Sequence, residues 1–172
     1  MKILVVVDMQ NDFIDGALGS EDAVSIVEGV AERVASFDGR IIFTRDTHTP
    51  DYMNTQEGRK LPVPHCIKDT DGWQISKKIS VPKDAVIIDK LTFGSSELGE
   101  LLVSLNNEER VESVELLGLC TDICVISNAM VAKAFLPEAE ISVNAALSRG
   151  VSPESHNTAL AAMRACQIDI IG

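Results

Sequence analysis

Aromatic side chains are scarce in this sequence, which has five Phe, one Tyr and one Trp among its 172 residues. Isoleucine, valine, leucine and alanine must therefore supply most of the hydrophobic core. Hydrophobic residues still make up 45% of the chain, an ordinary value for a globular protein. A chain of this length can bury roughly 70% of its unfolded surface, so it needs no disulfide or metal merely to fold. We expect one domain that spans residues 1–172.

Basic residues are also few. The chain has 15 Lys and Arg against 26 Asp and Glu, which gives a formal net charge of −11. A nucleic-acid backbone attracts clustered Lys and Arg, and an anionic membrane surface repels an acidic protein. We therefore expect neither a nucleic-acid partner nor a membrane partner.

The hydrophobic run at the N-terminus is short. It covers the five residues Ile3–Val7 and ends at Asp8, which is too short for a secretory segment or a membrane span. The four cysteines, at positions 66, 120, 124 and 166, are therefore expected to be reduced thiols in a cytoplasmic protein. Cys120 and Cys124 are spaced C-x3-C, which is not the C-x2-C spacing of common zinc or redox motifs.

Apolar, β-branched runs alternate with longer helical patterns. Strands are expected at 2–8, 40–45, 85–89, 113–118, 139–145 and 167–171, and helices near 21–37, 96–106, 123–134 and 154–165. Ser152 is the expected N-cap of the last helix because Pro153 follows it. This alternation predicts an α/β fold, a three-layer doubly wound sandwich with a mainly parallel six-stranded sheet. Residues 46–84 break the pattern and are expected to form an irregular insertion that carries a functional site.

Reactive side chains follow four of the expected strands. Asp8 ends the first strand, Asp46 follows the second, Lys90 follows the third, and 118–124 follows the fourth. Ligands of open parallel sheets bind beyond the carboxyl ends of the strands. We therefore expect these residues to meet at one edge of the sheet.

Cys124 is the candidate nucleophile. Thr121 or Asp122 can cap the following helix, which would place Cys124 in its first turn, where free N–H groups and the helix dipole favour a thiolate and could hold an oxyanion. Two alternatives remain open. Cys124 could be a small buried apolar residue, as most free cysteines are, or Cys120 could be the nucleophile instead.

Asp8 and Lys90 are the candidate partners of this thiol. Asp8 closes an apolar strand, so burial could raise its pKa and make it a general base and acid. Lys90 could stabilise the carboxylate and the thiolate together, because without a cation the two would repel each other. The alternatives are an acid that merely ends a strand and an ordinary surface lysine.

A metal site is expected in the irregular insertion. Asp46 and His48 form a D-x-H motif, and Glu57 lies between His48 and His65. His65 follows Pro62 and Pro64 and precedes Cys66. Mixed nitrogen and oxygen ligands suit zinc, iron or manganese better than calcium or magnesium. The alternative is a D-x-H that occurs by coincidence on an exposed loop.

These motifs together resemble one family. The sequence resembles the isochorismatase-like cysteine hydrolases, and within them the nicotinamidase/pyrazinamidase type, over essentially the whole chain. The residues that carry the resemblance are Val7-Asp8-Met9-Gln10-Asn11-Asp12-Phe13, Thr44-Arg45-Asp46-Thr47-His48, Pro64-His65-Cys66, Lys90 with Thr92-Phe93-Gly94-Ser95, and Gly118-Leu119-Cys120-Thr121-Asp122-Ile123-Cys124-Val125.

The resemblance implies a role for each matched position. It makes Cys124 the nucleophile, Asp8 the proton carrier and Lys90 the third member of a triad. It implies an oxyanion hole built from the backbone N–H groups of Cys120 and Cys124, and a cis peptide between Leu119 and Cys120. It also makes Phe13 a contact for the substrate ring.

The metal ligands also carry over to this chain. The resemblance assigns Asp46, His48 and His65 to the metal. Many members use a further histidine near the position of Asn54, and Glu57 fits a variant that uses a glutamate instead. Leu61 stands where members of this type place an aromatic residue that stacks on the ring.

The function that the resemblance implies is hydrolysis of a small carboxamide, most directly nicotinamide to nicotinate and ammonia in NAD metabolism, through a cysteine thioester. A divalent metal, first of all zinc, would bind the pyridine nitrogen. Leu61 keeps another small amide or carbamoyl compound open as the substrate, and a non-catalytic binding protein for a metal or ligand is the alternative from another class. The only partner expected besides the small amide is a second copy of the chain, in a homo-oligomer.

Overall fold

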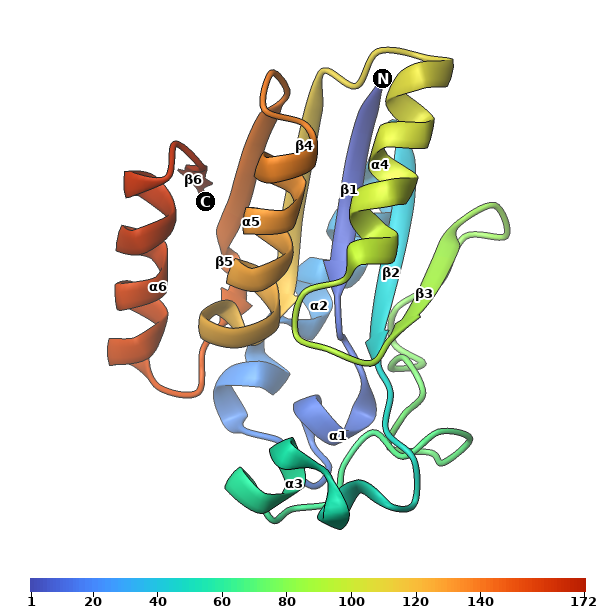
Figure 1. Cartoon of the computed structure of the whole chain (residues 1–172), viewed down its shortest axis with the longest axis vertical. Coiled ribbons are helices and arrows are strands. Elements are labelled where there is room, and N and C mark those ends of the chain that lie inside the picture. The colour runs from blue at the N-terminus through green and yellow to red at the C-terminus, as the bar shows by residue number, and fades with distance from the viewer.

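The computed structural model describes all residues from 1 to 172, and a single sheet runs through it (Figure 1). The sheet has six strands in the order β3-β2-β1-β4-β5-β6, and every neighbouring pair is parallel. The predicted α/β fold is therefore confirmed. The strands are β1 (Lys2–Val7), β2 (Arg40–Asp46), β3 (Val86–Lys90), β4 (Ser113–Leu119), β5 (Glu140–Arg149) and β6 (Asp169–Ile171).

Helices cover both faces of this sheet, which gives the three layers that the sequence predicts. In Figure 1, α4 (Ser96–Glu108), α5 (Ile126–Phe135) and α6 (Pro153–Ala165) lie in front of the sheet and α2 (Glu21–Ser36) lies behind it. The two short helices α1 (Asn11–Ile14) and α3 (Gln56–Lys60) lie below the carboxyl ends of the strands. None of these helices has the length and apolarity needed to span a membrane.

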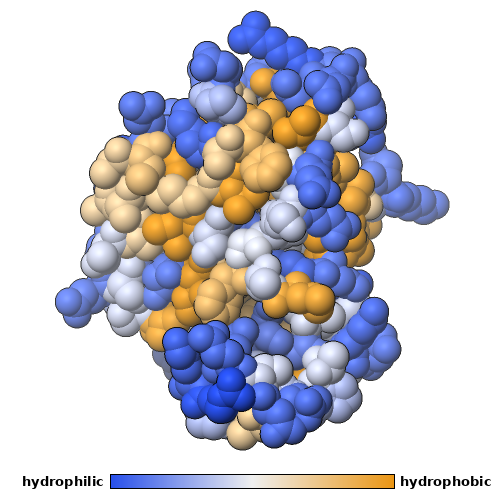
Figure 2. Space-filling model, in the orientation of Figure 1, coloured by the Kyte–Doolittle hydropathy of each residue, from blue (hydrophilic) through white to orange (hydrophobic).

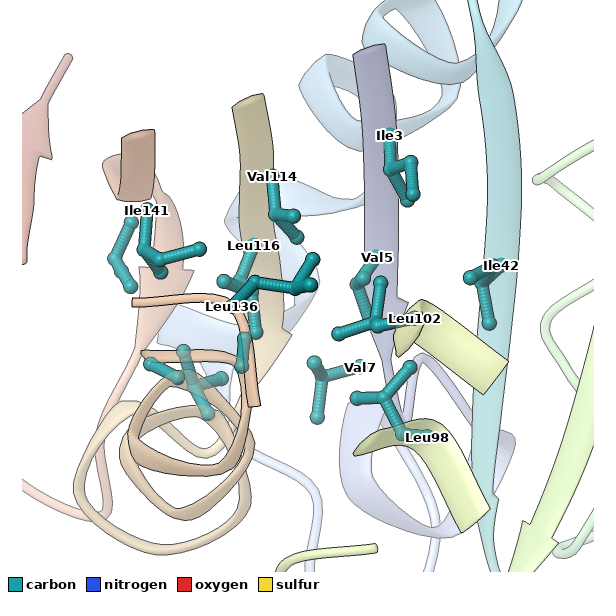
Figure 3. Packing of buried hydrophobic residues seen from close by; sticks show 14 of the residues in the cluster. Ile3, Val5, Val7, Ile42, Leu98, Leu102, Val114, Leu116, Leu136 and Ile141 are labelled. Carbon is teal, nitrogen blue, oxygen red and sulfur yellow. The ribbon is translucent and has the colours of Figure 1, made fainter. Parts of the chain in front are cut away.

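The core explains why the first strand is a continuous apolar run. Ile3, Val5 and Val7 point into the cluster under α4 and α5, where Leu98 and Leu102 of α4 face them (Figure 3). The alternate residues of β1 point into a second cluster against α2. Because side chains alternate along a strand, a strand covered on both faces must be apolar at every position.

The short elements are where the structure departs from the sequence-based expectation. Within the predicted irregular stretch 46–84 lie α3 and a 3-10 turn at Tyr52–Asn54. Strands β4 and β5 extend beyond their predicted ends, to Leu119 and Arg149. They are also less regular than expected, because their pairing shifts register between Leu116 and Gly118. The cap of α6 is as predicted, because the Ser152 side chain accepts a hydrogen bond from the Ser155 N–H.

Candidate active site

Four strand ends meet beside a buried lysine. Asp8 follows β1, Asp46 ends β2 and Lys90 ends β3, while Cys124 lies in the turn that follows β4. The Lys90 Nζ lies 2.6 Å from Asp8 Oδ2, 3.3 Å from Asp46 Oδ1 and 3.4 Å from Cys124 Sγ. All four side chains are buried. Because β3, β2, β1 and β4 are neighbours in the sheet, their ends bring together Asp8, Lys90 and Cys124, called the buried triad below.

Hydrogen bonds from two further buried residues hold the acids in place. Thr44 of β2 donates its hydroxyl to Asp8 Oδ1 at 2.6 Å. Gln10 donates its amide N–H to the Asp46 and Trp73 carbonyls and accepts the Asp46 N–H at 2.7 Å. Sequence reasoning gave Thr44 and Gln10 no role. Both lie inside the motifs that carry the family resemblance. Their hydrogen-bond partners belong to other elements of the fold, which a spacing pattern does not show.

The turn that carries Cys124 differs from the expected helix start. The Leu119–Cys120 peptide is cis, as the resemblance implies, and residues Thr121–Val125 form a π turn before α5 begins at Ile126. The Cys120 carbonyl accepts hydrogen bonds from the N–H groups of Ile123 and Val125. The Cys120 N–H donates to no backbone carbonyl, so it is free to bind an oxyanion.

The expectation that Thr121 or Asp122 caps a helix is wrong. The Thr121 hydroxyl is instead hydrogen-bonded to His156 Nδ1 of α6 at 2.8 Å. The Asp122 carboxylate accepts the Val151 N–H at 3.1 Å. Thr121 therefore ties the π turn to α6, and Asp122 ties it to the segment between β5 and α6, so neither side chain satisfies the N–H groups of its own helix.

The protonation of the triad is governed by burial. Burial raises the pKa of Asp8 even though the nearby Lys90 ammonium opposes the shift. Burial works against the charge on Lys90, but Asp8, Cys124 and Asp46 together hold its pKa above the ordinary value. The lysine is therefore charged, and Asp8 is a stronger base than an exposed aspartate, as the sequence led us to expect.

The expected low pKa of Cys124 is wrong in direction. Burial and the negative charge of Asp8 raise the pKa of the Cys124 thiol, and these effects outweigh the attraction of Lys90. The resting state is therefore a thiol. Burial, with the charge of Asp122, also raises the pKa of Cys120 to about 12, so this rival cysteine is a thiol too.

Asp46, His48, Glu57 and His65 also gather at this edge of the sheet, and we call them the metal group. One potential ligand atom from each of the four lies within 4.8 Å of the others. His48 Nε2 lies 2.9 Å from Asp46 Oδ2 and 3.5 Å from Glu57 Oε1. His65 Nε2 lies 3.5 Å and 3.8 Å from the same two oxygens.

The donor set of this group fits a divalent metal. His48 Nε2 is buried and, although Asp46 Oδ2 lies 2.9 Å away, forms no hydrogen bond of regular geometry. His65 bonds its Nδ1 to the Val63 carbonyl at 2.8 Å, which leaves its Nε2 free for a metal. Two imidazoles and two carboxylates are a mixed set that suits zinc, iron or manganese. Asn54 lies outside the group, since its amide is hydrogen-bonded to Asp51.

One cavity of about 830 Å³ connects the metal group to Cys124 of the buried triad. Both Cys120 and Cys124 line it, together with Phe13 and Leu61, the two positions expected to contact a substrate ring. The Phe13 ring lies 5.5 Å from the His65 ring, centroid to centroid. Sequence reasoning assigned no role to several further lining residues, which come from three loops: Leu18, Leu91, Phe93 and Val151.

Comparison with known proteins matches the whole chain. The model of the isochorismatase domain family matches residues 2–172. A curated relative, the nicotinamidase/pyrazinamidase of Mycobacterium tuberculosis, is 24% identical over 191 residues, which covers 99% of this chain and 98% of that protein. The nicotinamidase of Schizosaccharomyces pombe is 26% identical over 208 residues, with 98% and 91% covered.

A solved structure is similar throughout as well. The pyrazinamidase of Pyrococcus horikoshii, crystallised in complex with zinc, is 31% identical in sequence and superimposes with a TM-score of 0.84. The match covers 99% of this chain and 98% of that one. The chain therefore spans nearly the full length of its relatives.

Proposed function

The chain belongs to the isochorismatase family, and on this premise we propose that it is a cysteine-dependent amidohydrolase of small carboxamides such as nicotinamide. Relatives that align over nearly their whole length are named as enzymes acting on nicotinamide or pyrazinamide. Both of these substrates are planar nitrogen heterocycles with one carboxamide. The products would be the ring carboxylate and ammonia.

The contact of Lys90 with both Asp8 and Cys124 carries this proposal. The Lys90 ammonium lies 2.6 Å from the Asp8 carboxylate and 3.4 Å from the Cys124 sulfur. It therefore stabilises the negative charge whether the shared proton is on the sulfur or on the carboxylate. A structural ion pair would need no thiol beside it. Because the same cavity is lined by Cys124 and by members of the metal group, a small amide there can reach both.

The first half of the reaction forms an acyl-enzyme. Asp8 takes the proton of the Cys124 thiol, and the sulfur attacks the carboxamide carbon. The Cys120 N–H, together with the N–H of Cys124, holds the oxygen that becomes negative. Asp8 then returns the proton to the nitrogen, so that ammonia leaves and a thioester remains on Cys124.

The second half restores the enzyme. Asp8, again a carboxylate, takes a proton from a water molecule that attacks the thioester carbon. The carbon–sulfur bond breaks and the proton returns to Cys124, which releases the carboxylic acid. Lys90 remains charged throughout and stabilises whichever of Asp8 and the sulfur carries the negative charge.

We assign Asp46, His48, Glu57 and His65 as the ligands of a divalent metal, with zinc first among the candidates. When bound, the metal would act as a Lewis acid that binds the ring nitrogen and orients the ring. Phe13 contributes a wall for the same ring. Leu61 offers no ring to stack upon, so another small amide or carbamoyl compound is the second candidate substrate after nicotinamide.

Ammonia release from a panel of amides tests the proposal. The panel comprises nicotinamide, pyrazinamide and several carbamoyl compounds, each assayed with enzyme loaded with zinc, iron or manganese. We expect turnover of the heterocyclic amides and little turnover of the carbamoyl compounds. A protein that releases no ammonia from any of them with any of the metals would be a binding protein rather than an enzyme.

Removal of the metal tests the role of the metal group separately. The chelated, verified metal-free protein should show a raised KM for heterocyclic amides, and restoring zinc should reverse the loss. His48→Ala should bind less metal, as measured by elemental analysis, whereas Asn54→Ala should bind as much as the parent. Unchanged kinetics in metal-free protein would remove the metal from the reaction.

A further inference from the structure

The cavity is larger than the proposed chemistry requires. Its volume is about 830 Å³, whereas pockets for drug-sized ligands span roughly 300–1,000 Å³. A single heterocycle with one carboxamide is far smaller than a drug-sized ligand. A substrate held between Cys124 and the metal group would therefore leave much of this space to be filled by something else.

The cavity has an apolar border. Four of the lining residues are exposed hydrophobic side chains, and we call them the rim: Leu61, Leu91, Phe93 and Val151. Leu91 is 72% exposed and Val151 is 70% exposed, the two highest values among the large hydrophobic residues of the chain. Single exposed hydrophobic residues need no explanation, but several that border one ligand cavity mark a binding surface.

The rim is built by separate segments that converge on the site. Leu91 and Phe93 follow β3 directly after Lys90, Val151 lies between β5 and α6, and Leu61 follows α3. On the face shown in Figure 2, hydrophobic surface extends down to the level of the loop after β3, above a hydrophilic lower end. Val151 is also tied to the π turn that carries Cys124, since its N–H donates a hydrogen bond to the Asp122 carboxylate.

The charges around the cavity disfavour an anionic substrate. Its lining contains no arginine, and Lys60 is its one lysine. Sites that recognise carboxylates or phosphates commonly use an arginine, whose planar fork forms two parallel hydrogen bonds. The acidic net charge of −11 adds a general repulsion.

We propose that the natural substrate is an uncharged heterocyclic carboxamide with an apolar substituent remote from the amide, and that the rim binds this substituent. The inference rests on the proposed amidohydrolase function and narrows its substrate class. Burying the substituent against Leu91, Phe93 and Val151 removes apolar surface from water on both sides. The substituent also covers hydrophobic side chains that are exposed in the free protein. Its burial compensates for the binding energy lost because Leu61 cannot stack on the substrate ring.

A substituent series tests this proposal on the zinc-loaded enzyme. The value of kcat/KM for ammonia release is compared for nicotinamide and its 5-methyl, 5-propyl and 5-phenyl derivatives. Each buried methylene group should raise kcat/KM by about fourfold, until the rim is filled. The 5-carboxylate derivative should be a poorer substrate than nicotinamide.

Variants of the rim locate the effect. Leu91→Ser should reduce the ratio of kcat/KM for 5-propylnicotinamide to that for nicotinamide. Val24→Ser changes a hydrophobic residue that is also exposed, at 41%, but does not line the cavity, so this variant should keep the ratio of the parent enzyme. Sedimentation velocity on the same proteins shows whether the rim is instead covered by a second copy of the chain.

The outcomes separate this inference from the function on which it rests. A ratio of one or less in the parent enzyme, with nicotinamide still cleaved, overturns the substrate class. So does a Leu91→Ser variant that dissociates an oligomer and leaves the ratio unchanged. If the enzyme released ammonia from no member of the series, the result would count against the amidohydrolase function instead.

Discussion

At the scale of single residues, the contact of Lys90 with Asp8 and Cys124 offsets the cost of burying a negative charge. Burial raises the pKa of the acid and of the thiol alike, so neither readily carries a charge alone. Moving one proton from sulfur to carboxylate leaves the number of buried charges unchanged. The charged lysine stabilises both arrangements, so the transfer creates no new unpaired charge.

The protonation of Cys124 can be measured by alkylation with iodoacetamide. Because the pKa of this thiol is raised, its alkylation should be slow near neutral pH and should accelerate only in alkaline solution. Asp8→Asn removes a negative neighbour, which lowers the pKa of Cys124 and should shift the profile to lower pH. Peptide mass spectrometry resolves the site, and exposed Cys166 serves as an internal reference for the reagent.

The contrary result would be rapid alkylation of Cys124 near neutral pH that Asp8→Asn leaves unchanged. It would mean that the π turn and Lys90 lower the pKa of the thiol in spite of burial. The thiol would then need no base, and Asp8 would lose its role in the first step.

Sequence reasoning at this scale found the residues that carry reactive groups and missed those that position them. Asp8, Asp46 and Lys90 each follow an apolar strand, and parallel strands bring such ends together by rule. Gln10 bonds to residues 36 and 63 positions away in the chain, which no local pattern shows. The raised pKa of Cys124 depends mainly on its burial in the folded chain, which a motif does not report.

At the scale of elements, the end of β4 sets the position of Cys124, the proposed nucleophile. Gly118 has φ of +121°, in the left-handed region that side chains rarely adopt. A Cβ there would lie 2.1 Å from the carbonyl oxygen of Val7, the residue before Asp8. Only glycine lets β4 approach β1 so closely at the point where both strands deliver their reactive residues.

Gly118→Ala should therefore destabilise the protein severely, by about 4 kcal/mol or more, because backbone rather than a flexible side chain blocks the new methyl group. Urea unfolding measures the loss. Gly29→Ala in α2 is the matched control, since its Cβ would meet only the end of the Leu147 side chain at 2.7 Å and alanine favours a helix. Equal stability of the two variants would contradict the close approach of β4 and β1.

The sequence predicts the long helices and strands better than the short ones. Periodicity located the six strands and the four long helices with small errors at their ends. It missed α1, α3 and the turn at Tyr52–Asn54, which have four, five and three residues and therefore complete too few turns to show a period. It also placed Cys124 in a helical first turn instead of a π turn, because the side chains of Thr121 and Asp122 bond to another segment.

At the scale of the whole molecule, the irregular stretch 46–84 and the sheet should unfold together. Gln10 bonds to carbonyls of both Asp46 and Trp73, and Asp12 accepts the Cys66 N–H at 2.7 Å. Trp73 is the only tryptophan, is 5% exposed, and lies within this stretch. Its fluorescence therefore reports on the insertion, whereas far-ultraviolet circular dichroism reports on the sheet and helices.

We expect the two signals to show the same thermal midpoint, since the insertion is held to the sheet by buried hydrogen bonds. Removing the metal should lower both midpoints equally, because a ligand that binds only the folded state stabilises all of it. If fluorescence changes at a lower temperature than circular dichroism, the insertion unfolds independently and residues 1–172 do not form one cooperative domain.

The identity of the nucleophile tests the account most directly. Ammonia release is measured for Cys124→Ala and Cys120→Ala, each purified, folded by circular dichroism and loaded with zinc. We expect Cys124→Ala to abolish release and Cys120→Ala to retain much of it, because the role proposed for Cys120 uses its backbone N–H rather than its sulfur. Loss of activity in Cys120→Ala together with retained activity in Cys124→Ala would contradict the assignment of Cys124 and the mechanism built on it.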